Sequence, residues 1–309
     1  MSQHDNPPEE IPSPYKTPAH AELVTADIVE SKPRIWTALV VPIVGIVASL
    51  VVSTVVFVAA MFLIAGPPDP NQIEETLEKI FDHPLGIWAL VLPGQLTFLA
   101  AAILAAILSP IPLGKRLRLG KGRLPAWTWL LFLIATPTIG IATGYLIEAL
   151  GIEPSEHLQM LEDIITAQTG LAAFITALLV GLLPGFCEEI LFRGYVQGRL
   201  LKRWSPMAAI LLSSLLFAVA HIDPLHVCAV FPTGIWLGVI AYRADSIWPT
   251  ILCHFANNFL AVIVSNLSAE ADGTGQVELM LLVPCCIAML VSLFVLASDR
   301  FMNRDEVVS

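Results

Sequence analysis

Charged side chains are scarce in this sequence, and that scarcity indicates the class of protein. Of its 309 residues, 14% are charged and 56% are hydrophobic. An ordinary soluble domain is about 25% charged and about 45–50% apolar. A soluble fold could not cover this much apolar surface, so the composition is typical of a polytopic α-helical membrane protein. The apolar runs are continuous rather than alternating, which excludes a β-barrel.

Other features that the sequence lacks exclude further classes of protein. It has no basic stripe and a net charge of −10, so no nucleic-acid partner is expected. Its five cysteines form no Cys-x-x-Cys pair, so nothing predicts a disulfide framework or a thiolate zinc site. The first 33 residues are acidic and Pro-rich, unlike a signal peptide. They are expected to form a disordered cytoplasmic tail.

Apolar runs of about 17–25 residues predict an all-α bundle of about eight membrane spans. The predicted spans are residues 36–65, 86–108, 127–150, 169–191, 206–222, 225–242, 247–265 and 277–298. Together they predict one transmembrane domain, residues 34–298, followed by a C-terminal tail, residues 299–309. The fifth and sixth runs are nearly continuous, and Pro224 is expected to separate them.

Charges in the connecting segments predict the orientation in the membrane. Cations precede the first span, at Lys32 and Arg34. They also follow the second, fourth, sixth and eighth spans, at residues 114–123, Arg199, Lys202, Arg203, Arg243, Arg300 and Arg304. The opposite loops, residues 69–82, 153–163 and 268–276, are acidic and carry the single cation Lys79. By the positive-inside rule, both termini are expected in the cytoplasm, with the spans in a bacterial inner membrane. Helical spacing of apolar residues in the first two acidic loops predicts short interfacial helices.

A few polar residues remain inside the predicted spans. They are Glu188, Glu189 and Arg193 in the fourth span, His221 at the end of the fifth, and His254, Asn257 and Asn258 in the seventh. An acidic side chain at a helix centre costs about 2.5–3.5 kcal/mol on insertion scales, and intramembrane ionisable residues mark function by default. This set is therefore the candidate site, and the alternative is a buried ion pair that only ties helices together.

Spacing along the fourth span separates its two glutamates. Arg193 follows Glu189 by four residues, the distance between neighbours on a helix face, so this pair is expected to be mainly structural. Glu188 points about 100° away around the helix and has no local partner. It is the candidate for chemistry.

The seventh span supplies the second part of the candidate site. His254 and Asn258 are four residues apart and share one face. With His221 from another helix, they can direct three polar groups towards Glu188, as either a metal site or a metal-free acid–base site. Asn257 is expected to hydrogen-bond to a neighbouring helix instead.

Three short motifs carry a resemblance to a known family. The segments "EEILFRG", "FAVAH" and "HFANN" resemble the signatures of the CPBP family. These are the CAAX-processing and bacteriocin-processing (Abi) intramembrane proteases, related to the type II CAAX prenyl endopeptidases. The family pattern is E-E-x-x-x-R, F-x-x-x-H and H-x-x-x-N or D. It is matched here by Glu188, Glu189, Arg193, Phe217, His221, His254 and Asn258, within residues 169–265.

The resemblance implies peptide-bond hydrolysis inside the membrane. The implied substrates are membrane-anchored peptides or proteins, prenylated and CAAX-like or carrying a leader. Glu188 would be the general base that takes a proton from the attacking water, and His221 would hold that water or stabilise developing charge. His254 and Asn258 would complete the site with an oxyanion-type hydrogen bond.

The resemblance also raises the question of a metal, because the family is classed with metallopeptidases. Glu188, His221 and His254 are then candidate zinc ligands. The usual His-Glu-x-x-His helix is absent from the sequence, and Asn is a poor zinc ligand. The expected cofactor is thus either none or zinc, and the residue types slightly favour a glutamate-activated water without metal.

Two other functions compete with the peptidase. A non-catalytic membrane protein of the same fold could bind a partner, as an immunity protein does, although the intact motif set favours the enzyme. A small transporter could use Glu188 and the histidines as a proton relay, but the sequence shows no inverted repeat or paired broken helices.

Overall fold

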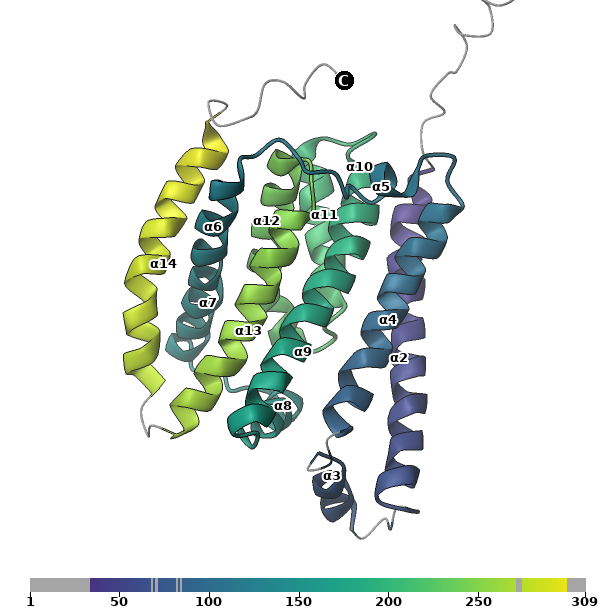
Figure 1. Cartoon of the computed structure of the whole chain (residues 1–309), viewed down its shortest axis with the longest axis vertical. Coiled ribbons are helices and arrows are strands. Elements are labelled where there is room, and N and C mark those ends of the chain that lie inside the picture. Colours follow the sequence, from purple (N-terminus) through teal and green to yellow (C-terminus); the bar gives the residue numbers. More distant parts are fainter. Residues whose placement is uncertain are drawn as a thin grey trace, which may run out of the picture. The chain divides into compact units, whose positions relative to one another are not determined.

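The structure is a computed structural model that describes residues 34–67, 69, 72–81, 83, 85–270 and 274–298. The two predicted tails, residues 1–33 and 299–309, lie outside the described residues. Within the described residues the elements are helices joined by turns and short loops (Figure 1). The prediction of an all-α polytopic bundle is confirmed.

Seven helical segments among the described residues are long and apolar enough to cross a membrane. They comprise α2 (Trp36–Ile64), α4 (Gly86–Ile107), α6 with α7 (Ala126–Ala135 and Pro137–Ala149), α9 with η1 and α10 (Gly170–Glu189, Ile190–Gln197 and Gly198–Leu200), α12 (Pro224–Ala244), α13 (Trp248–Glu270) and α14 (Thr274–Ala297). Each coincides with one predicted span. The protein is an integral multi-pass membrane protein.

The remaining predicted span, residues 206–222, is a shorter helix than expected. Helix α11 (Pro206–Val219) has 14 residues. At 1.5 Å per residue it is roughly 21 Å long, less than the roughly 30 Å of a bilayer's hydrocarbon core. The apolar composition of Ala220 and Ile222 extends the hydropathy signal past the true end of the helix. Ile222 adopts a left-handed backbone with φ 66°, and Asp223 then caps α12 by accepting from the backbone N–H of His226 at 2.9 Å.

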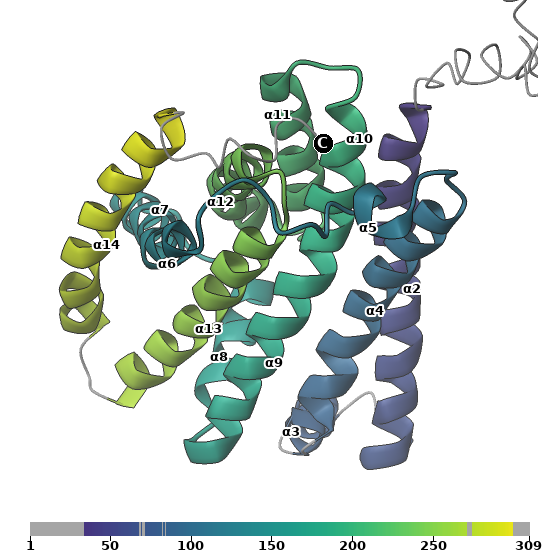
Figure 2. The ribbon, with the colours of Figure 1, turned by 45° about the horizontal axis from the view of Figure 1, so that its top comes forward.

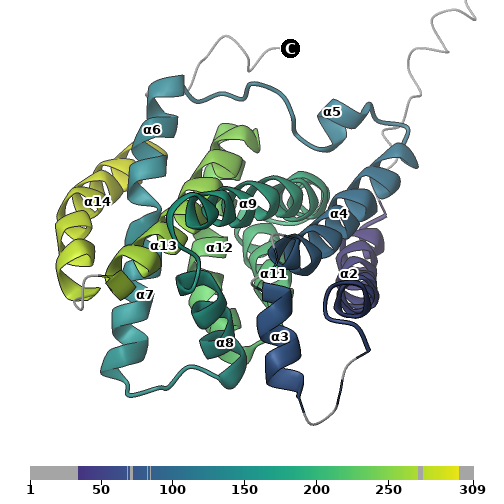
Figure 3. The same ribbon diagram turned by 60° about the horizontal axis from the view of Figure 1, so that its bottom comes forward.

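Short helices occupy the two ends of the bundle. Helices α3 (Ile73–Phe81) and α8 (Glu156–Thr166) form in the acidic loops, as predicted, and lie at the same end (Figures 1 and 3). Helix α5 (Leu113–Arg116), in the basic segment, lies at the opposite end with α10. The acidic and basic connections are therefore separated by the length of the spans.

Helix α9 lies at the centre of the bundle. The α2–α4 pair packs on one side of it and α13 packs on the other, an order that both side views show (Figures 1 and 2). Residues far apart in the sequence therefore meet on the surface of α9. Because of this arrangement, α4 contacts one glutamate of the first motif and α13 contacts the other.

Close contact between α9 and α13 depends on two glycines four residues apart, the spacing of small residues at membrane helix interfaces. A Cβ atom at Gly185 would lie 2.9 Å from the backbone nitrogen of Phe255, and one at Gly181 would lie 3.0 Å from the Phe255 ring. Only glycine permits this approach. It brings the backbone beside His254 directly against α9.

Helix α9 continues into the π-helical segment η1, whose eight residues are all buried. Two of its long polar side chains reach glycine carbonyls on α12. Arg193 donates to the carbonyl of Gly234 at 3.0 Å, and Gln197 donates to that of Gly238 at 2.8 Å. Such π-helical stretches are rare and are frequently found at functional sites. Here the segment fixes α12 against the end of α9.

Candidate active site

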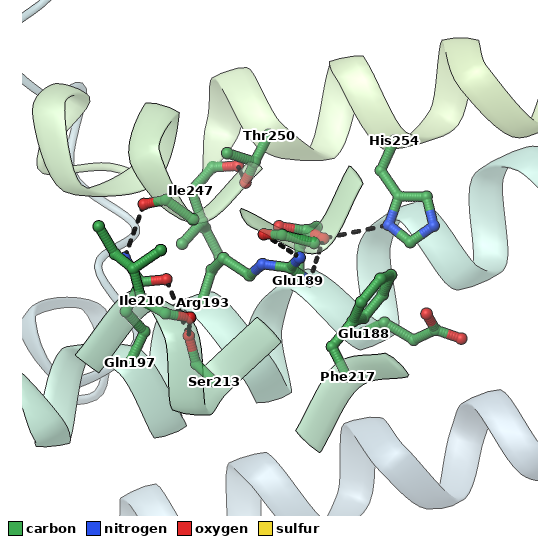
Figure 4. Close-up of polar contacts among 12 residues, drawn as sticks. Glu188, Glu189, Arg193, Gln197, Ile210, Ser213, Phe217, Ile247, Thr250 and His254 are labelled. Carbon is green, nitrogen blue, oxygen red and sulfur yellow. Dashed lines mark hydrogen bonds and ion pairs between the residues drawn. The ribbon is translucent and has the colours of Figure 1, made fainter. Parts of the chain in front are cut away.

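Glu189 is the most connected acidic side chain in the bundle interior. It is fully buried, and its Oε1 atom lies 2.8 Å from Arg193 Nη1 and 3.1 Å from His254 Nδ1 (Figure 4). The predicted pairing of Glu189 with Arg193 is confirmed. The contact with His254 joins the first motif, on α9, to the third, on α13.

Arg193 ties three helices together. It is fully buried, it pairs with Glu189, and it donates to the carbonyl of Gly234 on α12. Its guanidinium also lies 4.1 Å from the centre of the Phe217 ring on α11, a cation–π contact. In a buried Arg–Glu pair each charge compensates the other. Loss of one partner is strongly destabilising because it leaves the other charge unpaired in an apolar interior.

Phe217 of the second motif lies at the meeting point of the three motifs. Its ring centre is 5.6 Å from that of His254 and 5.2 Å from that of His221, both in edge-to-face geometry. The same ring packs under Arg193. The F-x-x-x-H spacing thus places one aromatic ring in contact with both motif histidines.

Glu188 has a different environment from its neighbour. It is buried, and its Oε1 atom accepts from Gln95 Nε2 on α4 at 2.8 Å. Its carboxylate extends away from the Glu189–Arg193 pair (Figure 4). Within the described part of the chain, the Oε2 atom of Glu188 has no hydrogen-bond partner. The expectation that Glu188 lacks a partner on its own helix is therefore correct, and the partner comes from α4.

His221 lies in the turn between α11 and α12. Its Nδ1 atom is 3.1 Å from the carbonyl oxygen of Phe217, and its ring centre is 4.6 Å from that of His226. Asp223 in the same turn accepts from the Ser155 hydroxyl at 2.6 Å. That hydrogen bond, together with the backbone N–H of His226, holds the pKa of Asp223 below its usual value.

Asn258 follows His254 by one turn on α13, as the spacing predicts, and its amide donates to the carbonyl of Val180 on α9 at 3.4 Å. Asn257 donates to Asn258 Oδ1 at 3.3 Å. The expectation that Asn257 bonds to a neighbouring helix is not met among the described residues, because its side-chain amide is turned towards Asn258 on its own helix.

The three motifs therefore meet around the α9–α13 interface. Glu189, Arg193, Phe217, His221 and His254 form one connected set of contacts. Glu188 is next to this set in the chain. Across the described residues, however, no hydrogen bond joins its carboxylate directly to a motif histidine or to Asn258.

Part of the chain is similar to a known protein family. Residues 170–260 match the family model described as "Type II CAAX prenyl endopeptidase Rce1-like". That segment contains all three motifs. Residues 170–260 are thus similar to the Rce1-like family. The match confirms the resemblance that the motifs indicated.

The chain is also similar to one curated protein. The chain is 27% identical over 204 residues to "Putative membrane peptidase YdiL" from Bacillus subtilis (strain 168). The similar region covers 64% of this chain and 75% of the relative. No solved structure matches the chain. Both similarities support a membrane peptidase.

The described residues do not offer a three-ligand metal site. No group of three or more His, Cys, Asp or Glu side chains there comes close enough together to hold a metal ion. The Nδ1 atom of His254 is already directed at Glu189. In this arrangement Glu188, His221 and His254 do not come together as the zinc set that the resemblance suggested, and the dependence on a metal stays a prediction.

Sequence reasoning missed Gln95, which makes the one described side-chain hydrogen bond to Glu188. Gln95 lies within the apolar run of α4, outside the Rce1-like segment and distant from every motif. A signal was present, because a side-chain amide in an apolar span needs a hydrogen-bond partner on another helix.

Proposed function

We propose that this protein is an intramembrane endopeptidase in which Glu188 activates the attacking water. The family relation supports the coarser statement, a membrane peptidase. The finer assignment rests on one observation: Glu188 has one oxygen held by the neutral amide of Gln95 and the other without a partner among the described residues, whereas Glu189 is paired with Arg193 and His254. A general base needs an oriented carboxylate with an uncommitted lone pair, and this arrangement supplies it.

The proposed reaction is hydrolysis by direct attack of water. Glu188 Oε2 takes one proton from the water as the water oxygen bonds to the carbonyl carbon of the scissile peptide. The carbonyl oxygen becomes an oxyanion in the tetrahedral intermediate. Glu188 then returns the proton to the leaving nitrogen as the C–N bond breaks, which yields a carboxylic acid and an amine and restores the enzyme.

His254 is proposed to stabilise the oxyanion. Its Nδ1 atom faces Glu189 at 3.1 Å, which fixes the ring and leaves Nε2 for a substrate. A carboxylate in this position stabilises an imidazolium and holds the ring in one orientation. Asn258, one turn along the same face, is proposed as a second donor, and His221 as a ligand of the water.

The proposed substrates are membrane-anchored peptides or proteins, including prenylated CAAX-like chains and leader peptides. A multi-pass enzyme with its reacting groups between the spans can receive a scissile bond from the bilayer. We further propose that both termini face the cytoplasm of a bacterial cell. The separation of the basic end, with α5 and α10, from the acidic end, with α3 and α8, supports this orientation.

The proposal is tested by comparing peptide termini in membranes of cells that carry either the wild-type chain or Glu188→Ala. The expected result is a set of new termini that only wild-type membranes contain. Glu148→Ala serves as the matched control, because Glu148 is exposed at the end of α7 and is distant from the site in the sequence. Identical termini in wild-type and Glu188→Ala membranes, at equal protein levels, would favour a non-catalytic binding protein.

A further inference from the structure

We propose that Gln95 of α4 is a positioning residue for Glu188, and that it also accepts the second hydrogen of the attacking water. This inference rests on the proposed function and extends it to a helix outside the Rce1-like segment. The observation behind it is a pair of side chains from α4 and α9, 93 residues apart in the chain, joined by a 2.8 Å hydrogen bond from Gln95 Nε2 to Glu188 Oε1.

The hydrogen bond fixes which carboxylate oxygen is available. Because Gln95 holds Oε1, the Oε2 atom is the one that remains for a proton. Among the described residues, neither Glu188 Oε2 nor Gln95 Oε1 has a hydrogen-bond partner, although both atoms are buried. Two acceptors on side chains that already contact each other form a complementary pair for a molecule with two donor hydrogens.

A water molecule is such a donor. We assign one of its hydrogens to Glu188 Oε2 and the other to Gln95 Oε1. The first hydrogen leaves as a proton to the carboxylate while the water oxygen bonds to the peptide carbonyl carbon. The second stays on that oxygen, held by the Gln95 carbonyl, so the lone pair that attacks keeps a fixed direction. Correct orientation of this kind accounts for large rate factors in enzymes.

The backbone of α4 is held on both sides of Gln95. A Cβ atom at Gly94 would lie 2.9 Å from Ser49 Oγ, so α2 packs tightly against this turn. Three residues after Gln95, the ring of Phe98 is buried with its centre 6.1 Å from that of Phe192 on η1. The amide is therefore presented to Glu188 from a packed helix rather than from a loop.

A purely structural role for Gln95 predicts different results. An interhelical hydrogen bond between α4 and α9 would contribute modestly to folding and nothing specific to turnover. Gln95→Met keeps the length and approximate volume of the side chain and removes both amide atoms. Gln95→Glu keeps the size but replaces the donor with a second carboxylate facing Glu188. Thr97→Val is a matched control, because the Thr97 hydroxyl bonds to the carbonyl of Pro93 on its own helix.

The experiment measures kcat and KM of the full chain in proteoliposomes. The probe is a quenched fluorescent peptide copied from a terminus that wild-type membranes produce and Glu188→Ala membranes lack. Gln95→Met and Gln95→Glu are each expected to lower kcat by roughly 10–100-fold with KM changed less than about twofold. Thr97→Val is expected to match the wild type, and all variants are compared at equal amounts of folded protein.

Each other outcome has a definite meaning. Gln95→Met activity within about twofold of wild type would overturn the positioning role, even with Glu188→Gln inactive. A fall that follows the amount of folded protein, or that appears in KM alone, would also overturn it, because a structural contact has those effects. If Glu188→Gln keeps full activity, the proposed function itself fails, independently of Gln95.

Discussion

The Glu189 carboxylate lies 3.1 Å from His254 Nδ1 on the neighbouring helix, while the same oxygen pairs with Arg193. The second glutamate of the first motif thus has a structural partner on its own helix and a candidate site residue across the interface. Its neighbour Glu188, held by Gln95, is the proposed base. The adjacent glutamates have different partners because one faces α13 and η1 and the other faces α4.

The first prediction concerns this dual contact. Glu189→Leu removes the partner of a fully buried Arg193 and is expected to lower the free energy of unfolding by about 3–5 kcal/mol. The double variant Glu189→Leu/Arg193→Met removes both charges and is expected to recover most of that stability, while cleavage stays low because His254 has lost its acceptor. Unfolding in detergent and a cleavage assay measure the two effects. Full cleavage by the double variant would show that Glu189 acts only through Arg193.

A second prediction concerns the α9–α13 interface. Gly185→Ala places a methyl group where a Cβ atom would lie 2.9 Å from the backbone of Phe255, so the two helices must separate. Overpacking of this kind costs about 1–3 kcal/mol, and here it also moves His254 away from Glu189. We expect lower unfolding stability and reduced cleavage. Gly144→Ala on α7 is the control, since nothing lies within 4 Å of its Cβ position, and equal losses in both variants would contradict this explanation.

Much of the fold could be predicted from the sequence because lipid imposes simple rules. Continuous apolar runs of sufficient length must be helices. The positions of the cations predict which end of the bundle faces the cytoplasm. The Glu189–Arg193 pair followed from spacing alone, since both residues lie on one helical segment. The sequence of the acidic loops has the apolar periodicity of α3 and α8.

The remaining features depend on contacts between helices, which spacing does not encode. The approach of His254 to Glu189 requires the packing of α13 on α9, and the bond from Gln95 to Glu188 requires the packing of α4. The amino-acid composition of η1 does not reveal that its backbone hydrogen bonds are π-helical. The early end of α11 was missed because Ala220 and Ile222 are as apolar as the helix before them.

A third prediction uses the turn that carries His221. The pKa of Asp223 is lowered chiefly by the Ser155 hydroxyl, so the carboxylate favours the folded state. This stabilisation is fully present above the pKa of an unfolded Asp, about 3.9, and is lost as the pH falls through the lower folded value. Asp223→Asn, which still caps α12, is expected to lose less stability than the wild type between pH 6 and pH 3. Unfolding curves at both pH values measure this, and equal losses in the two proteins would exclude Asp223 as the source.

A fourth prediction tests the orientation. In a background with Cys228 and Cys286 changed to Ala, a single cysteine is placed at Glu78, at Glu162 or at Lys121, all of which are exposed. A membrane-impermeant maleimide is expected to label the first two sites in intact cells and the third only after permeabilisation. The reverse pattern would place the basic end outside and contradict the cytoplasmic assignment of the termini.

The most direct measurement compares the turnover of Glu188→Gln with that of the wild type on one reporter peptide in proteoliposomes. The substitution keeps the size of the side chain and can keep the contact with Gln95, but it removes the base. We predict a fall in kcat of about 10²–10⁴-fold, the range for loss of general acid–base catalysis, with unfolding stability close to that of the wild type. A kcat within a few-fold of the wild type would contradict the assignment of Glu188 as the base that activates water.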